Sequence, residues 1–259
     1  MPARWTLLQE TQKRIELVEL YVDENLSIGQ IGKKLGLNYT SVYDRLVRLK
    51  VPVQRSKKLG YNNVRQDILI PKESVDLAEF VGIMLGDGHL SPTQVTVTLG
   101  NKEGMYVEYV TQLINKLFGV RPKWLFSQEG YCTVYLGSTK LVRWFLRMGL
   151  VSNKVRSQVD IPRWVFKDEQ YLRASIRGLF DTDGSIYRLK NGSIQINLRN
   201  FSLKLLNSAR EILIQLGFHP SEMTVGSIYL TRKQDICKFI TEIGFNNPKH
   251  MVRYGEFRK

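Results

Sequence analysis

Two Asp-Gly pairs are the residues of this sequence best suited to do chemistry. Asp87-Gly88 and Asp183-Gly184 stand 96 residues apart, and each pair ends the same skeleton, Gly-x-x-x-x-Asp-Gly. Each skeleton lies in an apolar segment that is compatible with a helix, so Gly88 and Gly184 are expected to supply the left-handed turn that ends it. One Asp-Gly pair is typical of an ordinary turn, but a second pair in register indicates a duplicated site.

Small side chains recur at every fourth residue in these two helical segments. They are Ala78, Gly82 and Gly86 in the first segment and Ala174, Gly178 and Thr182 in the second. Residues four apart lie on one face of a helix, and small side chains let two helix backbones approach closely. We therefore predict that the helices pack side by side and that Asp87 and Asp183 lie together at their ends.

Two neighbouring carboxylates at helix C-termini need a counter-ion. A helix C-terminus carries partial negative charge and favours Lys or Arg. Two adjacent acids also repel each other. A hard divalent cation between them offsets both this repulsion and the charge of the helix ends, because Mg²⁺ binds carboxylate and carbonyl oxygens. We predict a metal site made of Asp87, Asp183 and the last helical carbonyls, those of Gly86 and Thr182.

The elements around these motifs also occur twice, in the order αββαββα. The predictions are a strand at 94–101, a helix at 106–117, a hairpin at 122–137 and a helix at 139–148, then strands at 185–190 and 193–200, a helix at 203–216, a hairpin at 221–232 and a helix at 234–243. Asn191-Gly192 is a strong signal for a hairpin turn. The predicted fold class is α+β, with tandem repeats in residues 74–160 and 161–259.

The two motifs resemble those of a known family. Phe80–Gly88 and Ile176–Gly184 are similar to the motifs of single-chain LAGLIDADG homing endonucleases, and the resemblance covers about residues 74–250. It implies pseudo-twofold repeats whose motif helices form the central interface and whose saddle-shaped antiparallel sheets lie over DNA. It also implies that the last motif acids, Asp87 and Asp183, bind the metal.

The same resemblance implies roles for further residues. The family's sixth-position acid is Asp181 in the second copy but Leu85 in the first, a departure at a position that is not the usual metal ligand. Other family positions correspond to Asn101 and Asn200, expected to orient water, and to Lys154 and Lys249, expected to stabilise developing charge or to tune the water.

Alternating side chains on two predicted strands suggest a face that contacts DNA. Polar residues occupy every second position and apolar residues lie between them, as on a half-buried strand. Such polar side chains suit hydrogen bonding to base edges in the major groove. The candidates are Gln94, Thr96 and Thr98 in the first copy and Gln195, Asn197 and Arg199 in the second, extended by Arg188 and Lys190. A solvated sheet face is the alternative.

Residues 1–54 are predicted to form a small all-α helix-turn-helix segment. Ser27 and Asn38 fit N-cap positions, and Gly36 fits the end of the helix between them. The second helix would contact DNA through residues outside its apolar stripe. These candidates are Tyr39, Thr40, Ser41, Arg45 and Arg48. A helical hairpin that packs on the rest of the protein is the alternative.

The charge of the chain favours a nucleic-acid partner. The 259 residues include 38 Lys and Arg against 24 Asp and Glu, for a net charge of +14, which favours binding to a polyanion. Residues 55–73 are predicted to be a basic linker. No segment is apolar enough to span a membrane and no signal peptide is recognisable. We expect a cytoplasmic protein without a membrane partner, with an organellar or nucleoid location left open.

Together these features predict an endonuclease that hydrolyses both strands of a long, asymmetric DNA target with Mg²⁺ or Mn²⁺. It would act as a monomer in the homing of a mobile intron, and Ca²⁺ can bind such a site without supporting cleavage. The alternatives are a non-catalytic DNA-binding transcription regulator and an RNA maturase that binds its own intron RNA. An intein is disfavoured, because no length for a splicing domain precedes residue 74 and the sequence runs from Met1 to Lys259.

Overall fold

The computed structural model describes residues 6–24, 26–49, 51, 65 and 67–257. The chain forms two compact units, Met1–Asn62 and Asn63–Lys259. Most of the predicted basic linker, including Arg55-Ser56-Lys57-Lys58, lies outside the described residues, and the domain boundaries predicted from the sequence stay predictions. Within the described ranges, every helix is too short or too polar to cross a lipid bilayer.

The N-terminal unit is helical over its described residues. It contains α1 (Leu7–Val18), a π-helical turn η1 (Glu19–Asp23), α2 (Ile28–Leu35) and α3 (Tyr39–Arg48). The side chains of Ser27 and Asn38 cap α2 and α3, and Gly36 ends α2 with a φ of 65°, which glycine adopts without steric penalty. Val42 and Leu46 are fully buried, so the predicted apolar stripe of the second helix is confirmed.

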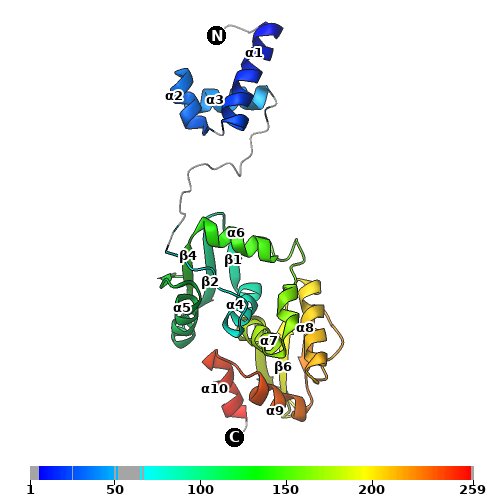
Figure 1. The fold of residues 1–259 in the computed structure, drawn as a ribbon. Helices are drawn as coiled ribbons and strands as arrows, with labels where there is room; N and C mark the ends of the chain where they lie inside the picture. The colour runs from blue at the N-terminus through cyan, green and yellow to red at the C-terminus, as the bar shows by residue number, and fades with distance from the viewer. Residues whose placement is uncertain (1–5, 25, 50, 52–64, 66, 258–259) are drawn as a thin grey trace. The chain divides into compact units, whose positions relative to one another are not determined.

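The second unit contains two copies of a helix-and-sheet arrangement (Figure 1). The first copy consists of α4 (Val75–Gly86), β1 (Gly88–Leu90), β2 (Gln94–Gly100), α5 (Gly104–Phe118), β3 (Lys123–Phe126), β4 (Tyr131–Gly137) and α6 (Thr139–Met148). The second consists of a 3₁₀ turn η2 (Arg163–Lys167), α7 (Glu169–Asp183), β5 (Gly184–Arg188), β6 (Ile194–Arg199), α8 (Leu203–Gln215), β7 (Ser227–Leu230), α9 (Lys233–Glu242) and α10 (Pro248–Phe257). Both sheets are antiparallel, in the orders β1-β2-β4-β3 and β5-β6-β7. The predicted α+β fold is confirmed.

The second copy departs from the predicted order in two places. Among the described residues no strand forms between α8 and β7, because Pro220 has no N–H for a ladder and the backbone N–H of Tyr229 donates to the Ser221 hydroxyl at 3.1 Å. α10 is not among the helices predicted from the sequence. Asn247-Pro248 nevertheless fits its start, since proline is favoured at the first helical position.

α4 and α7 lie side by side at the centre of this unit (Figure 1). A Cβ atom at Gly82 would collide with the carbonyl oxygen of Ser175, and a Cβ atom at Gly178 would collide with the carbonyl oxygen of Glu79. The same contact therefore occurs twice, once from each helix. The predicted stripe of small residues is confirmed, and the two glycines set the distance between the helices.

A buried ion pair crosses the same interface. Arg177 of α7 and Glu79 of α4 lie 2.7 Å apart, and Glu79 is 3% exposed. Tyr109 and Asn246 also donate hydrogen bonds to Glu79, at 2.5 and 2.6 Å. Breaking a buried pair of this kind costs about 3–5 kcal/mol, because one charge is left uncompensated. The network therefore favours one relative position of the two central helices.

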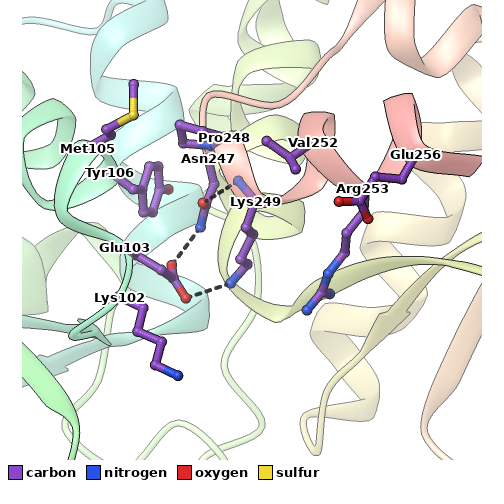
Figure 2. Close-up of a pocket in the computed structure, with 10 residues that line it drawn as sticks. All are labelled: Lys102, Glu103, Met105, Tyr106, Asn247, Pro248, Lys249, Val252, Arg253 and Glu256. Carbon is purple, nitrogen blue, oxygen red and sulfur yellow. Dashed lines mark hydrogen bonds and ion pairs between the residues drawn. The ribbon is translucent and has the colours of Figure 1, made fainter.

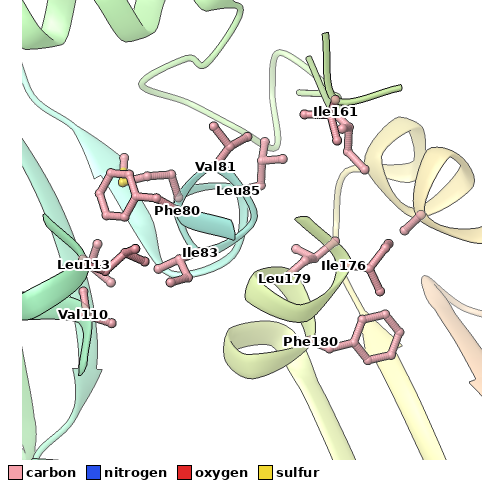
Figure 3. Packing of buried hydrophobic residues seen from close by; sticks show 14 of the residues in the cluster. Phe80, Val81, Ile83, Leu85, Val110, Leu113, Ile161, Ile176, Leu179 and Phe180 are labelled. Atoms are coloured by element: carbon pink, nitrogen blue, oxygen red, sulfur yellow. The ribbon is translucent and has the colours of Figure 1, made fainter. Parts of the chain in front are cut away.

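Aromatic side chains pack each central helix against an outer helix of its own copy, α4 against α5 and α7 against α9 (Figure 3). The ring centroids of Phe80 and Phe118 lie 5.6 Å apart, and those of Phe180 and Phe239 lie 5.0 Å apart. In Figure 3, Phe80 and Phe180 project away from each other, each into the apolar core of its own copy. Each central helix thus turns a small-residue face to the other central helix and bulky aromatic side chains to the apolar core.

Gly88 and Gly184 do not adopt the predicted left-handed conformation. Gly184 has φ −83° and ψ 162°, and Gly88 is also outside the positive-φ region. A Cβ atom at Gly88 would lie 2.5 Å from the Cα atom of Met84, and one at Gly184 would lie 2.9 Å from the Cα atom of Phe180. The prediction was wrong because each helix passes directly into a strand, where glycine is needed for space.

Candidate active site

Asp87 and Asp183 lie where the two central helices end. Asp87 is the residue that follows α4, and Asp183 is the last residue of α7. A Cβ atom at Gly86 would lie 3.3 Å from the carboxyl carbon of Asp183, so this carboxyl group lies against the end of α4. The structure thus brings together two acids that are far apart in the sequence.

Both aspartates at these helix ends are half-buried. Burial raises the pKa of Asp87 to about 6, and the negative charge of Asp183 adds to this shift. Burial also raises the pKa of Asp183, although a hydrogen bond from Asn200 Nδ2 at 2.6 Å opposes it. Two desolvated carboxylates of like charge need neutralisation by a proton or a cation.

The donor atoms at this point suit a hard divalent cation. The described residues contain no group of three His, Cys, Asp or Glu side chains that could hold a metal ion. A cation would therefore be held by the two carboxylates, backbone carbonyls and water, which is the mixed oxygen set that Mg²⁺ accepts. The Thr182 hydroxyl is occupied, since it donates to the carbonyls of Gly178 and Leu179 at 3.1 and 3.0 Å.

Lys154 is anchored on the end of α4. Its ammonium group donates to the carbonyl oxygen of Gly86 and, at 3.3 Å, to that of Met84. The predicted ligand position at Gly86 is therefore shared with a lysine. Burial lowers the pKa of Lys154, and the charges of Asp183 and Asp87 oppose this shift.

Lys249 has a different anchor. It forms an ion pair with Glu103, at 3.1 Å. Its positive charge, like that of Lys154, opposes the rise that burial causes in the pKa of Asp87 and of Asp183. Both lysines thus lie beside the acids, but no ion pair joins either lysine to either acid in the described part of the chain.

The two predicted asparagines differ in their relation to the acids. Asn200 donates to the carboxylate of Asp183 at 2.6 Å. Asn101 is exposed, and no hydrogen bond joins it to Asp87 among the residues that the structure describes. The structure therefore brings only one of the two to the site.

The strand register explains this difference. Gly184 pairs with Leu198 in the second sheet, whereas Gly88 pairs with Val97 in the first. Asn200 comes two residues after Leu198, the residue opposite Gly184 (200 − 198 = 2). Asn101 comes four residues after Val97, the residue opposite Gly88 (101 − 97 = 4). The register shift carries Asn101 away from the acid, a displacement that spacing along the sequence does not reveal.

Residues 170–244 match the family of LAGLIDADG-like domains. The chain contains a LAGLIDADG-like domain. The matched residues begin in α7 and end just after α9, so they include Asp183, Asn200 and the second sheet. The first copy lies outside the matched residues.

Two curated proteins are similar to the chain over a small part of their own length. The replication factor C small subunit of Methanocaldococcus jannaschii is 24% identical over 267 residues, which cover 95% of this chain. An A-type ATP synthase subunit of Pyrococcus abyssi is 27% identical over 150 residues, which cover 58% of this chain. The matched part spans 14% of the length of each relative.

Several solved structures also align with the chain. I-DmoI in complex with DNA and Ca aligns with a TM-score of 0.49 and 18% identity over 71% of this chain and 100% of that chain. I-WcaI bound to its DNA recognition sequence aligns with a TM-score of 0.48 and 12% identity over 79% of this chain and 95% of that chain. Full-length DUF199/WhiA from Thermatoga maritima aligns with a TM-score of 0.45 and 16% identity over 73% of this chain and 63% of that chain.

Both sheets show the alternation predicted from the sequence. In the LAGLIDADG-like domain, Ile196 and Leu198 are fully buried, and the candidate DNA contacts lie on the other face of β6. These are Gln195, Asn197 and Arg199. In the first copy Gln94, Thr96 and Thr98 likewise alternate with the buried Val95, Val97 and Leu99.

β5 adds side chains to the same face that were not predicted. The Ser185 hydroxyl donates to the Asn197 side chain at 2.7 Å, and the Tyr187 hydroxyl donates to the Gln195 side chain. Arg188 pairs with Ile194, so the pleat directs it to the opposite face. Both Arg188 and Lys190 are exposed, Lys190 in the turn after β5, and their contact with DNA stays a prediction.

The predicted contact residues of the N-terminal unit lie on α3. Tyr39, Thr40 and Arg48 are exposed, whereas Ser41 and Arg45 are half-buried. The core of this unit is formed by the opposite stripe of α3, and contact of these residues with DNA stays a prediction.

Glu103 and Asn247 belong to the site although the sequence did not point to them. Figure 2 shows Glu103 between Asn247 and Lys249, at one wall of a pocket of about 430 Å³. The Asn-Pro signal before α10 could have located Asn247. Nothing local marks Glu103, because it meets Lys249 only in the folded chain.

Proposed function

We propose that this chain is a site-specific, metal-dependent DNA endonuclease that cleaves both strands of a long, asymmetric target in the homing of a mobile intron. The observation that supports this proposal best is the pair of half-buried carboxylates at the meeting ends of α4 and α7. Burial raises the pKa of each acid, so each carboxylate would be stabilised by a cation beside it. The net charge of +14 supports a nucleic acid as substrate.

The residues of the site would have different roles in hydrolysis. Asp87 and Asp183 would hold Mg²⁺, which supplies a water of lowered pKa and charge neutralisation at the phosphate. Asn200 fixes the orientation of the Asp183 carboxylate through its hydrogen bond. Lys154 and Lys249 place positive charge beside the acids, where the negative charge of the reacting phosphodiester develops.

The sheets would hold the substrate. Each sheet has a polar face opposite its apolar core, and the polar side chains of the two sheets differ. Amides, hydroxyls and arginine suit hydrogen bonding to base edges, so different sets of side chains would select different half-sites. An asymmetric target bound by one copy of the chain follows from this difference.

Selection from a randomised duplex library tests the proposal. The protein is incubated with the library in Mg²⁺, in Ca²⁺ and in EDTA, and both cut ends and retained duplexes are sequenced. We expect cut ends of one sequence in Mg²⁺ and uncut retention of the same sequence in Ca²⁺. Retention without cutting in all three conditions would favour a transcription regulator. Selective retention of structured RNA, with no DNA cleavage, would favour a maturase.

A further inference from the structure

The lysine of the second copy is held by a chain of side chains from two repeats. Lys249 Nζ lies 3.1 Å from Glu103 Oε1, and the other carboxylate oxygen of Glu103 accepts a hydrogen bond from Asn247 Nδ2 at 2.8 Å. Figure 2 shows these contacts at the wall of the pocket. Glu103 precedes α5 in the first copy, whereas Asn247 and Lys249 belong to the start of α10. The partner of this lysine thus comes from the opposite repeat.

Asn247 is itself fixed on the end of α7. Its side-chain amide also donates to the carbonyl oxygen of Asp181 at 3.1 Å, and its backbone N–H donates to the Asp181 carboxylate at 3.0 Å. Its side-chain oxygen accepts the backbone N–H of Lys249 at 3.3 Å. Asn247 is 1% exposed and Asp181 is 0% exposed. An amide has two N–H donors, and both are used here, so its position is strongly restricted.

The first copy lacks this series of side-chain contacts among the described residues. Lys154 donates directly to backbone carbonyls at the end of α4. The position that corresponds to Asp181 is Leu85, which is 1% exposed and belongs to the apolar core. The departure from the family pattern at Leu85 thus lies in the copy whose site lysine, Lys154, is held by backbone carbonyls.

We infer that Asp181, Asn247 and Glu103 are positioning residues that hold Lys249 beside the catalytic acids, an inference that rests on the proposed endonuclease function. A lysine side chain has about 2 kcal/mol of rotamer entropy, and without its anchors Lys249 has the freedom to turn into solvent or onto the carboxylates. An ammonium group that lay on the carboxylates would compete with the divalent cation. The chain of contacts prevents both outcomes.

Cleavage kinetics test the inference on a duplex recovered from the library selection, with each DNA strand labelled separately. Glu103→Gln and Asn247→Ala are each expected to lower the cleavage rate about 10-fold, to raise the Mg²⁺ concentration needed and to leave DNA affinity in Ca²⁺ unchanged. Glu256→Gln is the matched control. Glu256 lines the same pocket, is exposed and lies outside this chain of contacts, so its loss should leave the rate unchanged.

A double-mutant cycle with Lys249 distinguishes residues that position this lysine from residues that bind the cation directly. In a Lys249→Met background, Glu103→Gln and Asn247→Ala should have no further effect, because residues that act through one partner are not additive. An equal loss of rate with and without Lys249 would overturn the inference for Glu103 and would indicate that it binds the cation itself. Because Asn247 is buried, the half-exposed Glu103 carries the test if Asn247→Ala fails to fold.

Acetylation footprinting measures the anchor without any cleavage. Lysines of the whole protein are labelled with acetic anhydride, and labelling is quantified by mass spectrometry, with the exposed Lys102 as internal reference. Glu103→Gln and Asn247→Ala are expected to raise labelling of Lys249 several-fold relative to Lys102. Unchanged labelling of Lys249 overturns the inference even if the protein cuts DNA. Increased labelling in a protein that cuts no DNA rejects only the proposed function.

Discussion

The two repeats carry an aspartate at the same helix end but surround it with different partners. In the second repeat Asn200 donates to Asp183, whereas the described residues offer Asp87 no such hydrogen bond. Lys154 is held by backbone carbonyls of its own repeat, and Lys249 is held by a side chain of the other repeat. The helix contact is thus mirrored, while the acid surroundings are not.

This difference teaches which part of a duplicated scaffold is constrained. The contacts of Gly82 and Gly178 are mutual, because each glycine meets a backbone carbonyl of the opposite helix. A larger side chain on either helix would displace both. The partners of each acid come from separate strands and loops, so they can differ without affecting the interface. We therefore expect the two DNA strands to meet unequal catalytic surroundings.

The largest expected effect comes from removing either carboxylate. Asp87→Asn and Asp183→Asn should each lower the rate of cleavage by at least about 10²- to 10³-fold, because an amide does not neutralise a divalent cation. Strand-resolved cleavage assays measure the loss, and fluorescence anisotropy in Ca²⁺ checks that duplex binding persists. Rapid cutting by either variant would exclude that aspartate as a metal ligand.

The mirrored contact predicts equal losses of stability from the two glycines. Gly82→Ala and Gly178→Ala should each lower the free energy of unfolding by about 1–3 kcal/mol, because the added methyl group forces the helices apart. Denaturant unfolding measures both. Gly104→Ala is the control, since a Cβ atom there meets nothing within 4 Å. Markedly different losses at Gly82 and Gly178 would break the symmetry argued for this interface.

The raised pKa of Asp87 predicts a pH dependence in the metal-free protein. Its pKa rises from an ordinary 3.8 to about 6 on folding, so the folded state binds this proton more tightly than the unfolded state. The free energy of unfolding should therefore fall as the pH rises from 3.8 to about 6 and stay level above that. The amplitude should be about 1–3 kcal/mol.

Comparison with Asp87→Asn isolates this contribution. Thermal unfolding of both proteins is measured in EDTA. The difference between their free energies of unfolding should shrink as the pH falls towards 4, about the ordinary pKa of an aspartate. Mg²⁺ should stabilise the wild type mainly above the folded-state pKa, and cleavage should decline below it, because protonated Asp87 cannot hold the cation. Parallel stability curves for the two proteins would contradict the assignment.

The smallest effect distinguishes the two asparagines. Asn200→Ala should slow cleavage about 10-fold, because a group that orients a metal ligand is lost. Asn101→Ala should leave the rate unchanged, since Asn101 is exposed and no hydrogen bond joins it to Asp87 among the described residues. Single-turnover cleavage of the selected duplex measures both. Equal effects of the two substitutions would mean that the register difference does not matter for catalysis.

Much of the fold followed from local patterns in the sequence. The capping residues Ser27 and Asn38, the glycine stripe on the central helices and the alternation of β2 and β6 all depend on near neighbours. The missing strand after α8 depends on Pro220 and on a hydroxyl that replaces a carbonyl as acceptor. Such a substitution of partners is decided by tertiary packing, so the sequence pattern alone predicted a hairpin.

The site was predictable only where duplication marked it. Asp87 and Asp183 repeat in register, so their pairing could be inferred from helix geometry. Glu103 and Asn247 have no repeated counterpart in the same role, and the pairing of Arg188 with Ile194 was not readable from the sequence. These contacts depend on the exact register and on α10, which brings distant segments together.

Helical periodicity and side-chain size act over a few residues, so the amino-acid sequence already implied that two small-residue helices would meet and carry their acids to one point. Which groups surround each acid depends on the strand register and on the docking of α10, because these set distances between segments that are remote along the chain. Those distances make the two halves of the site unequal.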